Sequence, residues 1–92
     1  MRLRLIALLL VTVPFAGEAQ AQYSGSGCGE LWYARNEIYK DAGYCFRTQR
    51  GIRAFGNAGC RYGNVEDVPL SANHRREVAE IQRWERIKGC PR

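Results

Sequence analysis

The 92-residue sequence lacks a hydrophobic segment long enough to cross a membrane. Its longest apolar run, from Leu5 to Phe15, falls well short of the roughly 20 residues that a membrane-spanning helix needs. A lipid anchor would require a cysteine directly after this run, and Glu18 follows Gly17 there instead. We therefore expect the run to serve neither as a span nor as a site of lipid attachment.

The same run has the layout of a secretory signal peptide. Arg2 and Arg4 precede it with positive charge, and the small residues Ala19 and Ala21 follow it at the spacing that a signal peptidase accepts. We predict that residues 1–21 are a signal peptide and that the mature chain begins at residue 22. This chain would be secreted or periplasmic.

Histidine is also scarce, and the cysteines contain no C-x-x-C pair. With His74 as the one histidine, a zinc site is not expected, and nothing in the sequence indicates another cofactor. The four cysteines all lie beyond the predicted cleavage site, and an even number in an oxidising compartment favours two disulfides. Three pairings are possible, and the order of residues alone does not choose among them.

The mature chain would be short and basic. At roughly 70 residues it forms one domain at most, whose core alone would contribute only about 3–5 kcal/mol. The full sequence carries a net charge of +5, and removing the predicted signal peptide leaves about +4. We expect an anionic envelope polymer or an acidic protein as the partner of such an exported chain, rather than nucleic acid.

The residue pattern predicts a small, mainly α-helical fold. Residues 22–29 are rich in glycine and serine and are expected to be a flexible N-terminal segment. Apolar residues at helical spacing predict a helix over 30–42 that Gly43 ends. A shorter helix should follow Thr48 and end near Gly56, with a long loop over 57–69.

Ser71 is a good N-cap for a last helix over 72–88, which Gly89 would end. If this helix packs antiparallel to the helix over 30–42, their ends bring Cys28 close to Cys90. We therefore favour disulfides between Cys28 and Cys90 and between Cys45 and Cys60, the second closing a loop around the short helix.

The segment from Ala34 to Phe46 resembles the YARHG domain family of bacteria. The hallmark helix of that family reads approximately A-R-N-E-I-Y-A-R-H-G-Y-x-F. Here Ala34 to Tyr39 match its first part, and Gly43, Tyr44 and Phe46 match its last part. The resemblance implies a small extracytoplasmic domain over 30–92, of a kind also found attached to peptidases and kinases, without an assigned activity.

The centre of the hallmark differs in this chain. Lys40, Asp41 and Ala42 stand where the family has Ala-Arg-His. A role that depends on the family's central arginine and histidine therefore does not carry over to this chain.

Two groups of residues are candidate binding sites. Arg35 lies near the middle of the apolar face of the helix over 30–42, close to Tyr39. It would either pair with a carboxylate, such as Glu77 or Glu85, or line a pocket for an anionic ligand. The last helix carries a concentration of arginines opposite its apolar residues, which is either a solvated face or a docking surface for phosphate or carboxylate groups: Arg75, Arg76, Arg83 and Arg86.

Support for catalysis is weak, because no serine or cysteine has an evident base beside it. We therefore expect an exported binding or accessory domain that docks through the arginines of the last helix. A cell-wall hydrolase or hydrolase inhibitor is one alternative. A structural or stress-related protein without a specific ligand is the other.

Overall fold

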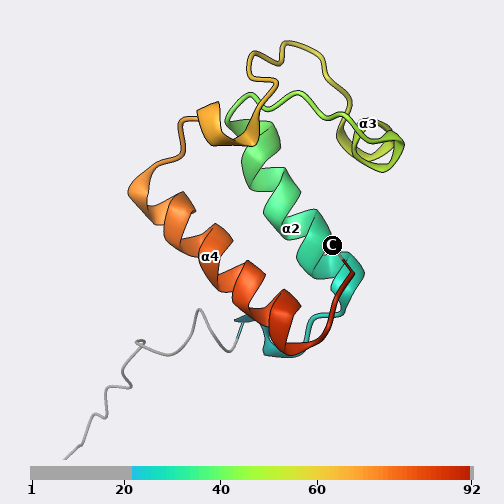
Figure 1. The fold of residues 1–92 in the computed structure, drawn as a ribbon, viewed down its shortest axis with the longest axis vertical. Helices are drawn as coiled ribbons and strands as arrows, with labels where there is room; N and C mark the ends of the chain where they lie inside the picture. The colour runs from blue at the N-terminus through green and yellow to red at the C-terminus, as the bar shows by residue number, and fades with distance from the viewer. Residues whose placement is uncertain (1–21, 92) are drawn as a thin grey trace, which may run out of the picture.

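The computed structural model describes residues 22–91, so the predicted signal peptide lies outside it. Four elements are bounded as α2 (Cys28–Asp41), α3 (Gln49–Phe55), the 3-10 helix η1 (Val65–Asp67) and α4 (Ala72–Ile87). Helices α2 and α4 lie side by side and run in opposite directions (Figure 1). The predicted small, mainly helical fold with two disulfides is confirmed.

Helix α2 begins two residues earlier and ends one residue earlier than the sequence predicts. At its start the backbone N–H of Gly27 donates to Oε1 of Glu30, at 2.9 Å. At its end Gly43 adopts φ = 100°, which favours glycine. The N–H of Tyr44 then folds back to donate to the carbonyl of Tyr39, at 3.0 Å.

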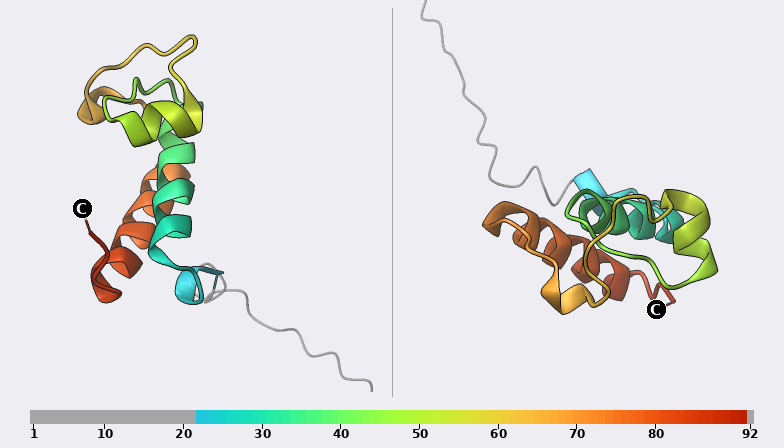
Figure 2. Two further views of the ribbon diagram at one scale, coloured as in Figure 1. Left: turned by 90° about the vertical axis from the view of Figure 1, so that its right-hand side faces the viewer. Right: turned by 90° about the horizontal axis from the view of Figure 1, so that it is seen from above.

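Helix α3 lies on the side of α2 that faces away from α4 (Figure 2). Thr48 caps it as predicted, accepting a hydrogen bond from the N–H of Gly51 on its side-chain oxygen. Gly51 is buried because the ring of Phe46 packs directly against its Cα; a Cβ there would lie 2.7 Å from Cδ1 of Phe46. The glycine that weakens the helix locally is therefore required for packing.

Helix α4 is bounded almost as predicted. The side chain of Ser71 accepts a hydrogen bond from the N–H of His74, at 3.0 Å, and Gly89 reverses the chain with φ = 67°. In the part of the chain that the structure describes, no helix has the length and apolar character needed to span a membrane.

The core lies between α2 and α4 and includes a residue that the sequence analysis assigned to the flexible segment. Leu31 and Ile81 are fully buried and pack with Tyr23, which is only 6 % exposed. The hydroxyl of Tyr23 donates to Oε2 of Glu77, at 2.6 Å. The expectation of a flexible polar segment over 22–29 is thus wrong for Tyr23, because its ring covers the apolar surface that α2 and α4 leave open.

Both favoured disulfides are confirmed. Cys28 and Cys90 join the start of α2 to the chain beyond α4, with Cα atoms 5.5 Å apart. Cys45 and Cys60 close the loop that contains α3, with Cα atoms 5.1 Å apart. Next to this second bond, the backbone N–H of Cys45 donates to the carbonyl of Tyr62, at 2.8 Å. The first bond therefore ties the start of α2 to the end of α4, and the second closes the loop around α3.

Candidate functional site

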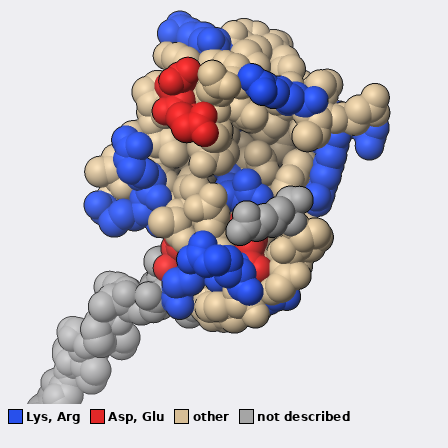
Figure 3. Space-filling model, in the orientation of Figure 1, with Lys and Arg blue, Asp and Glu red and all other residues tan. Residues whose placement is uncertain are grey.

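Helix α4 has two faces with different roles. Val78 and Ile81 are buried on the face that packs against α2. The four arginines that the sequence analysis selected are all exposed, and basic side chains gather over α4 in the space-filling view (Figure 3). We call these residues the α4 basic face: Arg75, Arg76, Arg83 and Arg86.

The arginines of this face make mainly local contacts. Arg75 donates to the carbonyl of Leu70, at 2.8 Å, and Arg76 donates to Oδ1 of Asn73. Of these four arginines, Arg83 alone forms an ion pair within residues 22–91. Its Nη2 lies 3.2 Å from Oε2 of Glu80, in the preceding turn. The Arg83 side chain is 45 % exposed, so solvent screens its attraction to Glu80. The α4 basic face therefore keeps most of its positive charge.

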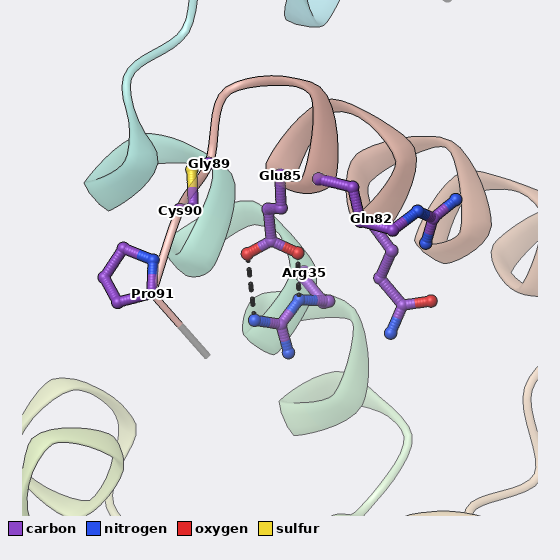
Figure 4. Close-up of a pocket in the computed structure, with 7 residues that line it drawn as sticks. Arg35, Gln82, Glu85, Gly89, Cys90 and Pro91 are labelled. Atoms are coloured by element: carbon purple, nitrogen blue, oxygen red, sulfur yellow. Dashed lines mark hydrogen bonds and ion pairs between the residues drawn. The ribbon is translucent and has the colours of Figure 1, made fainter.

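A hollow of about 550 Å³ opens beside the C-terminal end of α4. It contains Arg86 from the α4 basic face and Arg35 from α2, and the chain beyond α4 closes one side of it: the lining residues are Arg35, Gln82, Glu85, Arg86, Gly89, Cys90 and Pro91. Figure 4 shows the side chains of Arg35 and Glu85 pointing toward one another from the two helices, with Gln82 to one side. The hollow thus joins one end of the α4 basic face to the surface of α2.

Arg35 and Glu85 form a bidentate ion pair across the helices. Nε of Arg35 lies 2.8 Å from Oε1 of Glu85, and Nη2 lies 2.9 Å from Oε2 (Figure 4). The side chains are 21 % and 13 % exposed, so the pair is partly shielded from water. Of the two carboxylates considered for Arg35, Glu85 is the partner. Glu77 instead accepts a hydrogen bond from the hydroxyl of Tyr23.

Tyr39 does not line the hollow. It lies one turn beyond Arg35, half-buried, and its ring packs at an angle against Tyr44 with 6.0 Å between ring centroids. Burial raises the pKa of the Tyr39 hydroxyl, and the positive charge of Arg35 partly opposes that rise. The structure therefore brings Arg35 and Arg86 together but leaves Tyr39 as a packing residue.

The sequence analysis missed two contributors to the hollow, Gln82 and Pro91. Gln82 could have been found from its helical spacing, since it stands three residues before Glu85 and therefore on the same side of α4. Pro91 could have been found from the favoured disulfide, because a bond to Cys28 holds the residues around Cys90 against α2.

The hollow offers hydrogen-bond donors from both a charged and a neutral side chain. Its one carboxylate, Glu85, already accepts two hydrogen bonds from Arg35. Arg86 and the amide of Gln82 remain as donors for an incoming carboxylate or phosphate. Residues 22–91 contain no cluster of three or more His, Cys, Asp or Glu side chains that could hold a metal ion.

Comparison with known proteins supports the resemblance seen in the sequence. Searches against curated proteins and against solved structures found no match. The family model of the YARHG domain matches residues 10–86, which is most of the chain. YARHG domains are extracytoplasmic and have no known function, and the two disulfides fit an oxidising compartment. On this match, the chain belongs to the YARHG domain family.

Proposed function

We propose that this protein is an exported binding domain that docks on an anionic polymer of the cell envelope through the α4 basic face. The observation that carries the proposal is the arrangement of the four arginines. All are exposed along one helix, and only Arg83 has a carboxylate partner among the described residues. Guanidinium groups bind carboxylate and phosphate in a bidentate manner, so such a row suits a repeating anionic ligand.

Helix α4 is well suited to present these side chains. The disulfide between Cys28 and Cys90 holds its C-terminal end against α2, and the buried residues Val78 and Ile81 fix its rotation. The arginines are therefore held on a rigid element, and binding orders only their side chains. The hollow at the end of the face supports the same role, since Arg86 there can receive one anionic group while Arg35 stays neutralised by Glu85.

A matched pair of variants tests the proposal. The first replaces the α4 basic face with glutamine (R75Q, R76Q, R83Q and R86Q). The control replaces the same number of arginines elsewhere (R47Q, R50Q, R53Q and R61Q) and lowers the net charge equally. Retention of each disulfide-bonded protein would be measured on a lipid-free polymer fraction of the bacterial envelope, at low and at high salt.

We expect the α4 variant to lose retention at low salt and the control to keep it, because the position of the charge matters as well as its sum. Retention of the wild type should fall with added salt. Full retention of the α4 variant would refute the proposal. Loss of wild-type retention after protease treatment of the fraction would point instead to an acidic protein as the partner.

A further inference from the structure

The positive charge of this protein is concentrated in one segment that is not α4. Residues 66–91 carry five basic and five acidic side chains and are neutral, and residues 22–41 carry two basic and three acidic side chains. Residues 42–65, which we call the arginine lobe, contain no Asp or Glu and four arginines: Arg47, Arg50, Arg53 and Arg61. The net positive charge of the described chain therefore resides in the arginine lobe.

All four arginines of the lobe are exposed, and none belongs to an ion pair within residues 22–91. Arg47 donates to Oδ1 of Asn64, at 3.1 Å, and Arg53 donates to Oε1 of Gln49, at 2.8 Å. These partners are neutral amides, so the guanidinium charges are not cancelled. In the space-filling view, basic side chains lie over α3 without acidic ones beside them (Figure 3).

The ring of Trp32, beside these arginines, is already covered by other side chains. The guanidinium of Arg50 lies 3.8 Å above the ring of Trp32, and Phe55 packs against Trp32 and against Tyr33. Stacking on sugars or bases requires an open ring face. Trp32 therefore does not provide a platform for a glycan or a nucleic acid without displacement of Arg50.

Large side chains are nevertheless exposed at and beside α3. Tyr33 is 46 % exposed on α2 and Ile52 is 44 % exposed on α3, among the arginines. Basic residues together with exposed tyrosine and isoleucine are the composition of surfaces that sit at the boundary between lipid headgroups and acyl chains. An acidic protein would complement the charge but would leave no distinct role for the apolar pair.

We propose that the arginine lobe docks on the surface of an anionic phospholipid bilayer. Arg47, Arg50, Arg53 and Arg61 bind the headgroup phosphates, and Ile52 enters the headgroup region. The disulfide between Cys45 and Cys60 holds the lobe in one shape, so its charges act together. This surface is separate from the α4 basic face, and either can bind without the other.

Co-sedimentation with protein-free vesicles tests this inference. The disulfide-bonded mature chain would be mixed with vesicles of phosphatidylglycerol and phosphatidylcholine, or of phosphatidylcholine alone. The lobe variant (R47Q, R50Q, R53Q and R61Q) is compared with the α4 variant (R75Q, R76Q, R83Q and R86Q), which has the same net charge. Each protein is first checked for two intact disulfides and for helical content.

We expect the wild type to bind the anionic vesicles and not the neutral ones. The lobe variant should bind about 600-fold more weakly, because each of its four basic side chains near an anionic bilayer contributes roughly fivefold. The α4 variant should keep most of the affinity. Arginine-to-lysine replacement at the four lobe positions should restore binding, and Ile52→Ser should weaken the binding that remains at high salt.

Three results would overturn the inference. They are equal losses in the lobe and α4 variants, equal binding to neutral and anionic vesicles, and wild-type binding to soluble polyglutamate but not to anionic vesicles. Should the lobe variant fail to fold, the single variant Arg53→Glu provides the same comparison, since Arg53 is exposed and donates to Gln49 of its own helix. Unchanged vesicle binding of that variant would likewise count against the lobe.

Discussion

At the scale of single residues, the ion pair between Arg35 and Glu85 explains how an arginine is accommodated on the packing face of α2. The methylene stem of Arg35 lies along the helix interface while its head reaches the carboxylate of α4. A charged group in that position is tolerated because its partner comes from the opposite helix. The pair therefore links the two helices as well as neutralising the hollow.

Glu85→Gln should lower the free energy of unfolding by about 1–3 kcal/mol, since Arg35 would remain partly buried without its carboxylate. Urea denaturation at neutral pH measures this change. The control Glu80→Gln removes the ion pair to Arg83, whose side chain is 45 % exposed, and keeps an oxygen that can accept the hydrogen bond from Nε1 of Trp84. It should cost less than about 1 kcal/mol. Equal changes in the free energy of unfolding would show that the interhelical pair contributes no more to stability than the exposed pair.

Titration of Tyr23 should lower the stability of the protein at alkaline pH. Burial and the neighbouring Glu77 raise the pKa of its hydroxyl well above the usual value near 10. The folded chain therefore keeps this proton when the unfolded chain releases it. The stabilising contribution is complete below about pH 10 and is lost as the pH rises further.

Tyr23→Phe should reduce stability at neutral pH by about 1 kcal/mol, because the hydrogen bond to Glu77 is lost. It should also flatten the decline of stability above about pH 10, because that titrating group is absent. Urea midpoints between neutral pH and about pH 11 would record both effects. The exposed control Tyr33→Phe should follow the wild-type curve, and a wild-type decline in Tyr23→Phe would contradict the assignment.

At the scale of elements, α3 illustrates a conflict between helix propensity and packing. Gly51 weakens the helix locally, but the ring of Phe46 occupies the space where a side chain would be. That ring stacks on Phe55, with centroids 5.0 Å apart. The element exists because of its cap at Thr48 and its contact with Phe46. Propensity alone would not predict that Gly51 is needed.

Gly51→Ala should therefore destabilise the protein by about 1–3 kcal/mol, although alanine favours helices. Gly29→Ala in α2 is the matched control, since a Cβ there meets nothing within 4 Å. It should stabilise the protein by up to about 1 kcal/mol. Thermal melting should show a lower melting temperature for Gly51→Ala and a higher one for Gly29→Ala. A higher melting temperature for Gly51→Ala would show that Phe46 can move aside.

At the scale of the whole molecule, the two disulfides contribute what a small core does not. The bond between Cys28 and Cys90 spans 62 residues of sequence, and the bond between Cys45 and Cys60 spans 15. In the chain-entropy model the first should contribute roughly 4 kcal/mol and the second about 3 kcal/mol. Both are large against the stability of a domain of this size.

Removing the pair Cys28 and Cys90 by alanine substitution should lower the melting temperature more than removing Cys45 and Cys60. The physical reason is the longer loop, together with the loss of the anchor beside Leu31 and Ile81. Melting with and without reductant, after a mass measurement of the free thiols, tests this order. A melting temperature unaffected by reductant would contradict the role given to the bonds.

The prediction from sequence succeeded where interactions are local and failed where they are distant. The caps at Thr48 and Ser71 and the helix end at Gly43 depend on hydrogen bonds within a few residues, and the structure confirms them. Antiparallel packing of two helices was enough to favour the correct disulfides. The positions of Tyr23 and Tyr39 were not predicted, because each depends on how one helix is rotated against its neighbour.

By itself, the sequence determined the helices, their ends, the four cysteines that cross-link them and the family to which the chain belongs. Only the tertiary structure decided that Arg35 pairs with Glu85, that Glu77 accepts a hydrogen bond from Tyr23, and that Arg86 lines a hollow together with a residue of α2. The partners in these ion-pair and hydrogen-bond contacts are at least 50 residues apart in sequence. Such contacts follow from the rotation and offset of α2 and α4, which the joint packing of Tyr23, Leu31 and Ile81 sets and no local pattern encodes.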